Sequence, residues 1–429
     1  MKKMITFQLF ITIICINFSF AQKKPNIVFI LADDYGIAEV GAYGADNYKT
    51  PNIDKLAKSG VKFNHCYTAS LCGPSRALIL TGRYAYNTGA TNQDATGKFT
   101  PKDEEMIPKM LRPAGYVSTS IGKWGQLPLM PTDFGFDSYL TFKGSGIYWN
   151  TQEKGKDYFV NGETILLKDK QYMPDLMHQK AVDFLVANKS KPFFLYYPLS
   201  HIHNEILATP DSKLGSKNLY FDNVTYMDKL VGKLMSTLDS LHLLENTLVI
   251  FMGDNGTAQY GVDNATINGR KLSGKKGTML EGGGLVPMIA YWKGVSKAGK
   301  ISNMMIDASD IFPTIMELAG IKSSANKIDG QSILLEIKGK PSTHRSWAYN
   351  QLANMYYVRE LNWKLNEKGE LYDMTKAPFE EILVDANTTD KNAIAAKLRL
   401  QKVLATLNPA GGIIDKGDGT GRHAGKNKD

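Results

Sequence analysis

Short apolar runs alternate with longer amphipathic stretches from Pro25 onward, and this alternation constrains the fold more than any other feature. Apolar runs of this length indicate buried strands, and apolar residues at helical spacing indicate helices between them. Strands that alternate with helices build a parallel sheet covered by helices. The predicted strands are 26–32, 116–121, 192–198, 247–253 and 286–292. The predicted helices are 53–59, 104–111, 173–188, 220–241 and 308–319.

The pattern changes after Gly330, where short aromatic-rich strands are followed by one helix, 391–407. We therefore predict an α/β chain with a large, mostly parallel sheet sandwiched by helices and a smaller C-terminal antiparallel α+β subdomain. The predicted boundaries are 22–335 for the main domain, 336–410 for the subdomain and 411–429 for a mobile tail rich in Gly, Lys and Asp.

The composition excludes several other classes of protein. Of 429 residues, 43% are hydrophobic and 22% are charged, which is ordinary for a globular protein and excludes collagen-like, disordered and disulfide-scaffold chains. The formal net charge of +9 suits polyanions but does not choose among nucleic acid, membrane and sulfated glycan. The sequence contains no nucleic-acid motif, so we expect no nucleic-acid partner.

The N-terminus resembles an export signal. Met1-Lys2-Lys3 precedes an apolar run from Met4 to Phe20, and small residues follow at a cleavage position near Ala21. We predict a signal peptide over 1–21 and a periplasmic or secreted protein. A membrane anchor and a lipid-attachment site at Cys15 are the alternatives. No later segment has the roughly 18 apolar residues of a span, so we expect no stable membrane insertion.

Two predicted strands end in acidic or amide residues. The first is followed by Asp33 and Asp34, and the fourth by Asp254 and Asn255. Because ligands bind at the carboxyl ends of parallel strands, these oxygens favour one Ca²⁺ or Mg²⁺ site. A turn with a helix cap is the alternative for each pair taken alone.

A cysteine lies just ahead of another predicted helix. Pro74 is placed to open that helix and Gly82 to end it, so Cys72 lies at the N-terminus, where backbone N–H groups favour anions. Arg76, one turn along, can present a fork of donors to an anionic oxygen. A disulfide with Cys66 is the alternative use of Cys72.

The segment C-G-P-S-R-A-L-I-L-T-G resembles the signature of the type I sulfatases, the formylglycine-dependent, cysteine-type family of the alkaline phosphatase superfamily. The order of the other motifs is similar over almost the whole chain: L-A-D-D-Y-G, T-P-N-I-D, G-K-W, P-L-S-H-I-H, M-G-D-N-G, K-K-G-T-M-L-E-G-G and E-L-Y-D. The resemblance extends to bacterial polysaccharide sulfatases. It implies that 22–335 is a sulfatase catalytic domain.

The resemblance also implies the roles of individual residues. Cys72 would be oxidised to formylglycine by a formylglycine-generating or anaerobic sulfatase-maturing enzyme. One Ca²⁺ would be held by Asp33, Asp34, Asp254, Asn255 and the modified Cys72. Arg76 would steady the formylglycine hydrate, whose hydroxyl attacks sulfur. Lys123 and Lys276 would grip the sulfate oxygens, for which a compact cation with several donors is suited.

The histidines are harder to assign. The family pattern P-H-x-P aligns best with His203, which would protonate the leaving alcohol. The histidine that usually follows G-K-W is missing, because Gly125 and Gln126 stand there. We consider His201 as its substitute. Leu285 also departs from the family pattern, at a position where arginine is common, and we expect it to affect local packing or substrate contacts more than chemistry.

The expected function is removal of sulfate from a sulfated carbohydrate, with algal polysaccharide such as ulvan, carrageenan or fucoidan as the first choice. The alternatives are a glycosaminoglycan sulfatase, a phosphonate or phosphate ester hydrolase, and a non-catalytic glycan binder. We expect substrate contacts from loops 139–157 and 259–273, where Tyr148, Trp149 and Arg270 are candidates to stack on sugars or pair with anionic groups.

Overall fold

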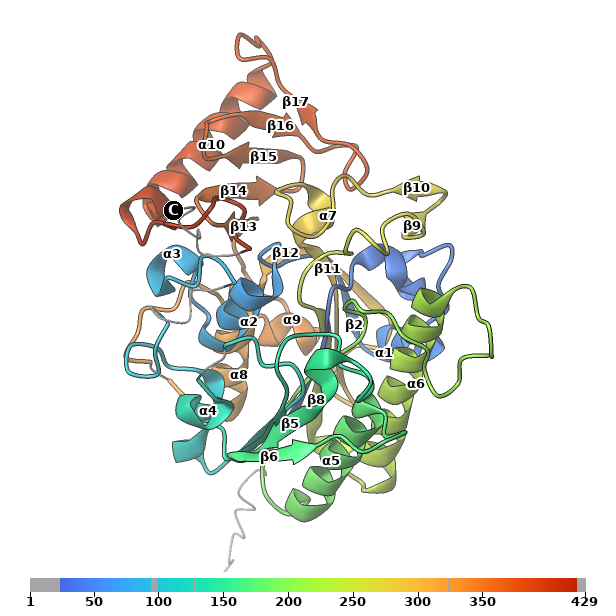
Figure 1. Ribbon diagram of the computed structural model, residues 1–429. Helices are drawn as coiled ribbons and strands as arrows, with labels where there is room; N and C mark the ends of the chain where they lie inside the picture. The colour runs from blue at the N-terminus through green and yellow to red at the C-terminus, as the bar shows by residue number, and fades with distance from the viewer. Residues whose placement is uncertain (1–23, 94–98, 127–128, 323, 423–429) are drawn as a thin grey trace, which may run out of the picture.

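The computed structural model describes residues 24–93, 99–126, 129–322 and 324–422. The predicted signal peptide, 1–21, lies outside the described residues. Figure 1 shows a large sheet covered by helices, with a smaller sheet and one helix at the C-terminal end of the chain. None of the helices in the described ranges combines the length and apolar character needed to cross a bilayer.

The large sheet has ten strands in the order β12-β2-β11-β8-β1-β7-β3-β4-β5-β6. The run β8-β1-β7-β3-β4 is parallel throughout, whereas β11 lies antiparallel to both of its neighbours. The mostly parallel sheet is thus confirmed. The strands are β1 (Asn26–Ala32), β2 (Val61–Tyr67), β3 (Val117–Ile121), β4 (Ser138–Thr141), β5 (Asp157–Val160), β6 (Glu163–Leu166), β7 (Phe193–Pro198), β8 (Thr247–Gly253), β11 (Leu285–Trp292) and β12 (Lys300–Asp307).

Helices cover both faces of this sheet (Figure 1). On one side α1 and α5 each contact α6, and on the other α2, α4 and α9 each contact α8. Alternate residues of β1 follow the pleat: Ile27, Phe29 and Leu31 join one core, and Val28 and Ile30 join the other. The helices of the main domain are α1 (Pro51–Ser59), α2 (Cys72–Thr81), α3 (Ala85–Thr88), α4 (Ile107–Leu111), α5 (Met173–Asn188), α6 (Leu219–Ser240), α7 (Glu281–Gly284), α8 (Ile311–Ala319) and α9 (Leu334–Ile337).

A five-stranded antiparallel sheet, in the order β13-β14-β15-β16-β17, follows with one long helix packed on it, which confirms the predicted subdomain class. A buried ion pair between Arg359 of β14 and Glu281 of α7, 2.7 Å from Nε to Oε1, joins it to the main domain. Its elements are β13 (Trp347–Leu352), β14 (Met355–Glu360), β15 (Trp363–Asn366), β16 (Leu371–Asp373), β17 (Ile382–Leu383) and α10 (Lys391–Leu407), and a separate hairpin consists of β9 (Thr266–Ile267) and β10 (Arg270–Lys271).

The predicted mobile tail needs a correction over residues 411–422. Asp415 is buried, and its carboxylate accepts hydrogen bonds from Thr91 and Asn92 of the main domain. The backbone N–H of Ile413 donates to the carbonyl of Tyr86 at 2.7 Å. A polar composition does not reveal such contacts, because they depend on partners far away in the sequence. Residues 423–429 lie outside the described part of the chain.

Candidate active site

Three neighbouring parallel strands bring the predicted polar residues to one edge of the sheet. Ala32 of β1 pairs with Gly253 of β8, so the acidic residues that follow the two strands lie side by side. The N–H of Asp34 donates to Oδ1 of Asp254 at 3.0 Å, and the N–H of Asp254 donates to the carbonyl of Ala32 at 2.9 Å. The N–H of Asp33 donates to the carbonyl of His201, which follows β7, at 2.8 Å.

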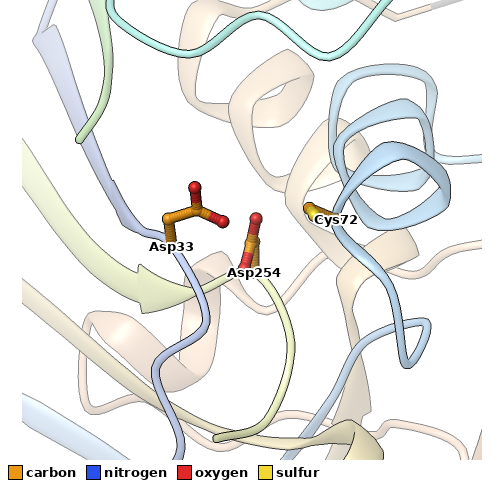
Figure 2. Close-up of side chains that lie close together, drawn as sticks. All are labelled: Asp33, Cys72 and Asp254. Carbon is orange, nitrogen blue, oxygen red and sulfur yellow. The ribbon is translucent and has the colours of Figure 1, made fainter. Parts of the chain in front are cut away.

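Cys72 faces these carboxylates from the first residue of α2. Figure 2 shows the side chains of Asp33, Asp254 and Cys72 converging. One ligand atom from each of the three lies within 4.8 Å of the other two, and all three residues are buried. Cys66 is a second free cysteine, buried in β2, so the alternative of a Cys66–Cys72 disulfide is wrong.

Three cations compensate the carboxylates. Arg76 donates from Nε and Nη2 to Oδ2 of Asp254 at 3.1 and 2.7 Å, and from Nη1 to the carbonyl of Lys123 at 2.7 Å. Nζ of Lys123 lies 2.9 Å from both carboxylate oxygens of Asp33. Nζ of Lys276 lies 2.5 Å from Oδ1 of Asp34. Each predicted lysine therefore contacts the acidic cluster, which consists of Asp33, Asp34 and Asp254.

The pKa values reflect this crowding of charge. Burial raises the pKa of Asp254 to about 6, helped by Asp33 and opposed by Arg76. Burial also opposes ionisation of Asp34, but Lys276 and His203 outweigh it and hold the pKa of that carboxyl below its ordinary value. Burial is therefore the main cause that opposes ionisation of Asp254, whereas the nearby cations favour ionisation of Asp34.

The donor set fits a hard divalent cation. The oxygens come from Asp33, Asp34, Asp254 and Asn255, all buried. Oδ1 of Asn255 has no hydrogen-bond partner, although its Nδ2 donates to Asp34. An unpaired buried amide oxygen beside three carboxylates is the kind of ligand atom that Ca²⁺ or Mg²⁺ would accept.

The two histidines differ in position. Nε2 of His203 lies 3.8 Å from Oδ2 of Asp34, and the side chain is 25% exposed. Burial and Lys123 lower the pKa of His203 to about 4. Its Nδ1 lies 2.7 Å from the carbonyl of Asn204, which can only accept, so Nδ1 carries the hydrogen of the neutral ring and Nε2 faces the acidic cluster.

His201 is unsuited to replace the missing histidine. Its ring is fully buried among the aromatic rings of Tyr148, Tyr172 and Tyr226, and its Nε2 lies 3.0 Å from the hydroxyl of Tyr172. Burial lowers its pKa to about 3. The prediction that His201 substitutes for that histidine is therefore wrong, because the side chain joins an aromatic core.

Two glutamines lie beside the nucleophile position instead. Nε2 of Gln93 is 3.2 Å from Sγ of Cys72, and its Oε1 accepts from the N–H of Gly73 at 2.7 Å. Nε2 of Gln126 donates to the carbonyl of Gly73 at 3.1 Å. Gly125 has a φ of +92°, and a Cβ there would lie 3.1 Å from Cδ of Arg76, so glycine leaves room for the guanidinium.

Gln93 and Tyr260 are site residues that the sequence does not reveal. Gln93 belongs to no motif. The hydroxyl of Tyr260 donates to Oδ2 of Asp34 at 2.6 Å, and the side chain is 38% exposed. Tyr260 falls in the predicted loop 259–273, so chain position could have suggested it, but a tyrosine in a loop is too common to be singled out.

The other predicted substrate contacts have partners within the protein. Tyr148 is fully buried and donates to the carbonyl of His203, so it presents no face to a sugar. Nε1 of Trp149 donates to the carbonyl of Ala208. Arg270 pairs with Glu380 at 2.7 Å. Leu285 is buried in β11 and packs in the core.

A buried acidic cluster, matched cations and a cysteine at a helix N-terminus suit the binding and hydrolysis of an ester of an inorganic oxyacid. The sulfatase family profile matches residues 25–321. The chain belongs to the sulfatase family and is a hydrolase of sulfuric ester bonds.

Individual relatives agree with this assignment. The chain is 34% identical to the N-acetylgalactosamine-6-sulfatase of Canis lupus familiaris over 360 residues, which cover 77% of this chain and 69% of the relative. The solved structure of Ps i-CgsB in complex with k-i-k-neocarrahexaose has a TM-score of 0.77 at 29% identity and covers 90% of this chain and 93% of that one. PsFucS1 sulfatase from Pseudoalteromonas sp. has a TM-score of 0.75 at 24% identity, covers 91% of this chain and 92% of that one, and shares the fold. The fold is the alkaline phosphatase-like fold of sulfatases, as predicted.

Proposed function

We propose that this enzyme removes sulfate from an algal polysaccharide of the carrageenan type or from its oligosaccharides. The observation that carries the sulfatase chemistry is the convergence of Cys72 with Asp33 and Asp254. Asp33 is paired with Lys123, and Asp254 is paired with Arg76. The carrageenan choice is supported by the likeness to Ps i-CgsB, whose structure holds k-i-k-neocarrahexaose. The similarity to N-acetylgalactosamine-6-sulfatase favours a glycosaminoglycan as the second candidate.

We propose that Cys72 is converted to formylglycine by a maturing enzyme and that one Ca²⁺ binds to Asp33, Asp34, Asp254, Asn255 and the modified residue. Bound together, these groups supply a hydrated aldehyde as an oxygen nucleophile and a Lewis acid beside it. Export by the signal peptide over 1–21, to the periplasm or the medium, would bring the enzyme to a polysaccharide too large to enter a cell.

The chain's own cations bind and orient the sulfate group. Lys123 and Lys276 reach the acidic cluster from two different loops, so their ammonium groups can hold different oxygens of one sulfate. Arg76, fixed by Asp254 and the carbonyl of Lys123, places its positive charge close to Cys72. These fixed charges stabilise the charge that develops on the sulfuryl oxygens.

His203 is the proposed proton donor to the leaving alcohol. Its Nδ1–H is held by the carbonyl of Asn204, so Nε2 is the atom that takes up a second proton and donates it to the leaving oxygen. The charge of Lys123 and Lys276 contributes to the low pKa of His203, and a bound sulfate ester would offset that charge and favour protonation of Nε2.

The test of the proposed function is sulfate release from a panel of carrageenan, fucoidan, ulvan and glycosaminoglycan oligosaccharides. The protein is coexpressed with a formylglycine-generating enzyme, and the control is the same protein produced without it. Release that depends on maturation supports the proposal, and the sugar that is cleaved decides between the two substrate classes. Confirmed aldehyde at position 72 without release from any of these sugars would overturn it.

Removal of the divalent cation is expected to lower both activity and stability. Without it the carboxylates of Asp33, Asp34 and Asp254 lose a ligand that binds only the folded chain. Dialysis against a chelator should lower the rate about tenfold or more and lower the Tm. Refilling with Ca²⁺ or Mg²⁺ in parallel shows which ion restores both. Full activity with no bound metal by elemental analysis would contradict the proposed cation.

Replacement of His203 is expected to affect poor leaving groups selectively. A sugar alkoxide needs a proton, whereas nitrophenolate leaves without one. His203→Ala should therefore lower kcat on the sulfated sugar about a hundredfold and kcat on 4-nitrophenyl sulfate much less. His201→Ala is the matched control, because it removes the neighbouring buried ring. It should leave the ratio of kcat on the sulfated sugar to kcat on 4-nitrophenyl sulfate unchanged. Equal losses of the two substrates with His203→Ala would argue against proton donation.

A further inference from the structure

The C-terminal segment, defined here as residues 412–422, returns from the subdomain to the active site. Its buried Asp415 is bound on two sides. The carboxylate accepts from Thr91 and Asn92, and the backbone exchanges hydrogen bonds with the side chain of Asn354, at 2.8 and 2.9 Å. A buried carboxylate with this many donors fixes the segment in place.

The end of the segment lies against the loop that contacts the nucleophile position. The carbonyl of Gly421 accepts from the N–H of Gln93 at 3.0 Å, and the side chain of the same Gln93 reaches Sγ of Cys72. Gln93 is therefore the single residue that links Gly421 to Cys72 through hydrogen bonds. The next residue in the chain is Arg422.

Arg422 extends over the turn that carries Lys276. Gly277 has a φ of +78°, and a Cβ built there would lie 3.1 Å from Nη2 of Arg422 and 3.8 Å from Cδ2 of Leu71. The N–H of Gly277 donates to the carbonyl of Ser70 at 2.9 Å, which ties this turn to the start of α2. The guanidinium thus lies against Gly277, the residue after Lys276, in a turn that also packs near Leu71, the residue before Cys72.

The charge of Arg422 is available to a ligand. Arg76, Lys123 and Lys276 are each paired with a carboxylate of the acidic cluster. Arg422 is exposed, and within the described part of the chain no ion pair involves it. An exposed guanidinium offers a planar fork of donors that matches the oxygens of a sulfate or carboxylate group.

We propose that Arg422 forms a second anion site, which binds a sulfate or carboxylate group of the substrate close to the sulfate ester that is cleaved. The proposal rests on the proposed function and narrows its substrate class to carbohydrates with at least two anionic groups near each other. The C-terminal segment thus contributes to substrate choice as well as to packing.

The test compares Arg422→Gln with Lys416→Gln, which removes another exposed cation of the same segment. Each matured variant is assayed on a disulfated carrageenan disaccharide, its monosulfated counterpart, a uronate-containing monosulfated disaccharide and 4-nitrophenyl sulfate. Arg422→Gln should lower kcat/KM about 10- to 100-fold, mainly through KM, on substrates with a second anionic group. It should change 4-nitrophenyl sulfate hydrolysis less than about twofold, since that ester lacks the group. The disulfate and uronate arms identify which anion is bound.

Binding is measured separately with the unmatured protein, which carries Cys72 as cysteine. Calorimetry with the disulfated disaccharide should show weaker binding for Arg422→Gln and unchanged binding for Lys416→Gln. Equal losses on all four substrates, or equal binding by both variants, would overturn the second anion site. Absence of sulfate release by the parent protein would instead refute the proposed function, while calorimetry would still test the anion site.

Discussion

Cys72→Ala is expected to abolish sulfate release and to leave the Tm nearly unchanged. The substitution removes the atom from which the aldehyde is made, so no oxygen nucleophile can form at the N-terminus of α2. The side chain is small, and its sulfur contacts the amide of Gln93, so little packing is lost. Sulfate release by ion chromatography and thermal unfolding are measured on the same preparation.

Cys66→Ala is the matched control for this prediction, because Cys66 is also a free, buried cysteine but lies in β2 beside Met288. It should lower stability by about 1 kcal/mol through lost packing and keep kcat. Cys72→Ser adds a sharper test. A single serine hydroxyl can accept the sulfuryl group but has no second hydroxyl to expel it, so a peptide sulfated at position 72 should accumulate. Multiple turnovers by Cys72→Ser would contradict the need for formylglycine.

Much of the acidic cluster could be predicted because it depends on short-range pattern. β1 and β8 have the predicted bounds, and both are continuous apolar runs, so the residues after them were identified as neighbours from strand geometry alone. The position of Cys72 at the start of α2 follows from Pro74, which lies in the first turn of the helix, and from Gly82, which caps its C-terminus. Each of these features depends on residues that are consecutive in the sequence.

Other features depend on contacts that one stretch of sequence does not contain. β2 alternates apolar and polar residues and forms a strand buried between β11 and β12, which a search for continuous apolar runs misses. The buried position of His201 depends on tyrosines from three other segments: Tyr148 in a loop, Tyr172 just before α5 and Tyr226 in α6. Gln93 reaches Cys72 only because the chain returns across 21 positions. Tertiary packing decides each of these cases.

Arg76→Gln is expected to impair both catalysis and folding. The Arg76 guanidinium is fully buried and binds Asp254 twice and the carbonyl of Lys123 once. Its removal leaves the Asp254 carboxylate without its nearest cation, which costs about 3–5 kcal/mol for a buried pair. Loss of the fixed donor at the nucleophile position should lower kcat about a thousandfold. Urea unfolding and single-substrate kinetics measure the two effects.

Two further variants separate catalysis from stability. Arg345→Gln breaks a similar buried pair, in which Nη2 lies 2.7 Å from Asp307 and Nη1 lies 2.6 Å from Asp310, outside the acidic cluster. It should lower stability comparably and keep kcat of the folded protein. Arg76→Lys keeps the charge but has no fork to join Asp254 with the Lys123 carbonyl, so it should fold and still lose most of kcat. If folded Arg76→Lys kept the parent kcat, the positive charge alone would be sufficient, and the geometry of the guanidinium would have no catalytic role.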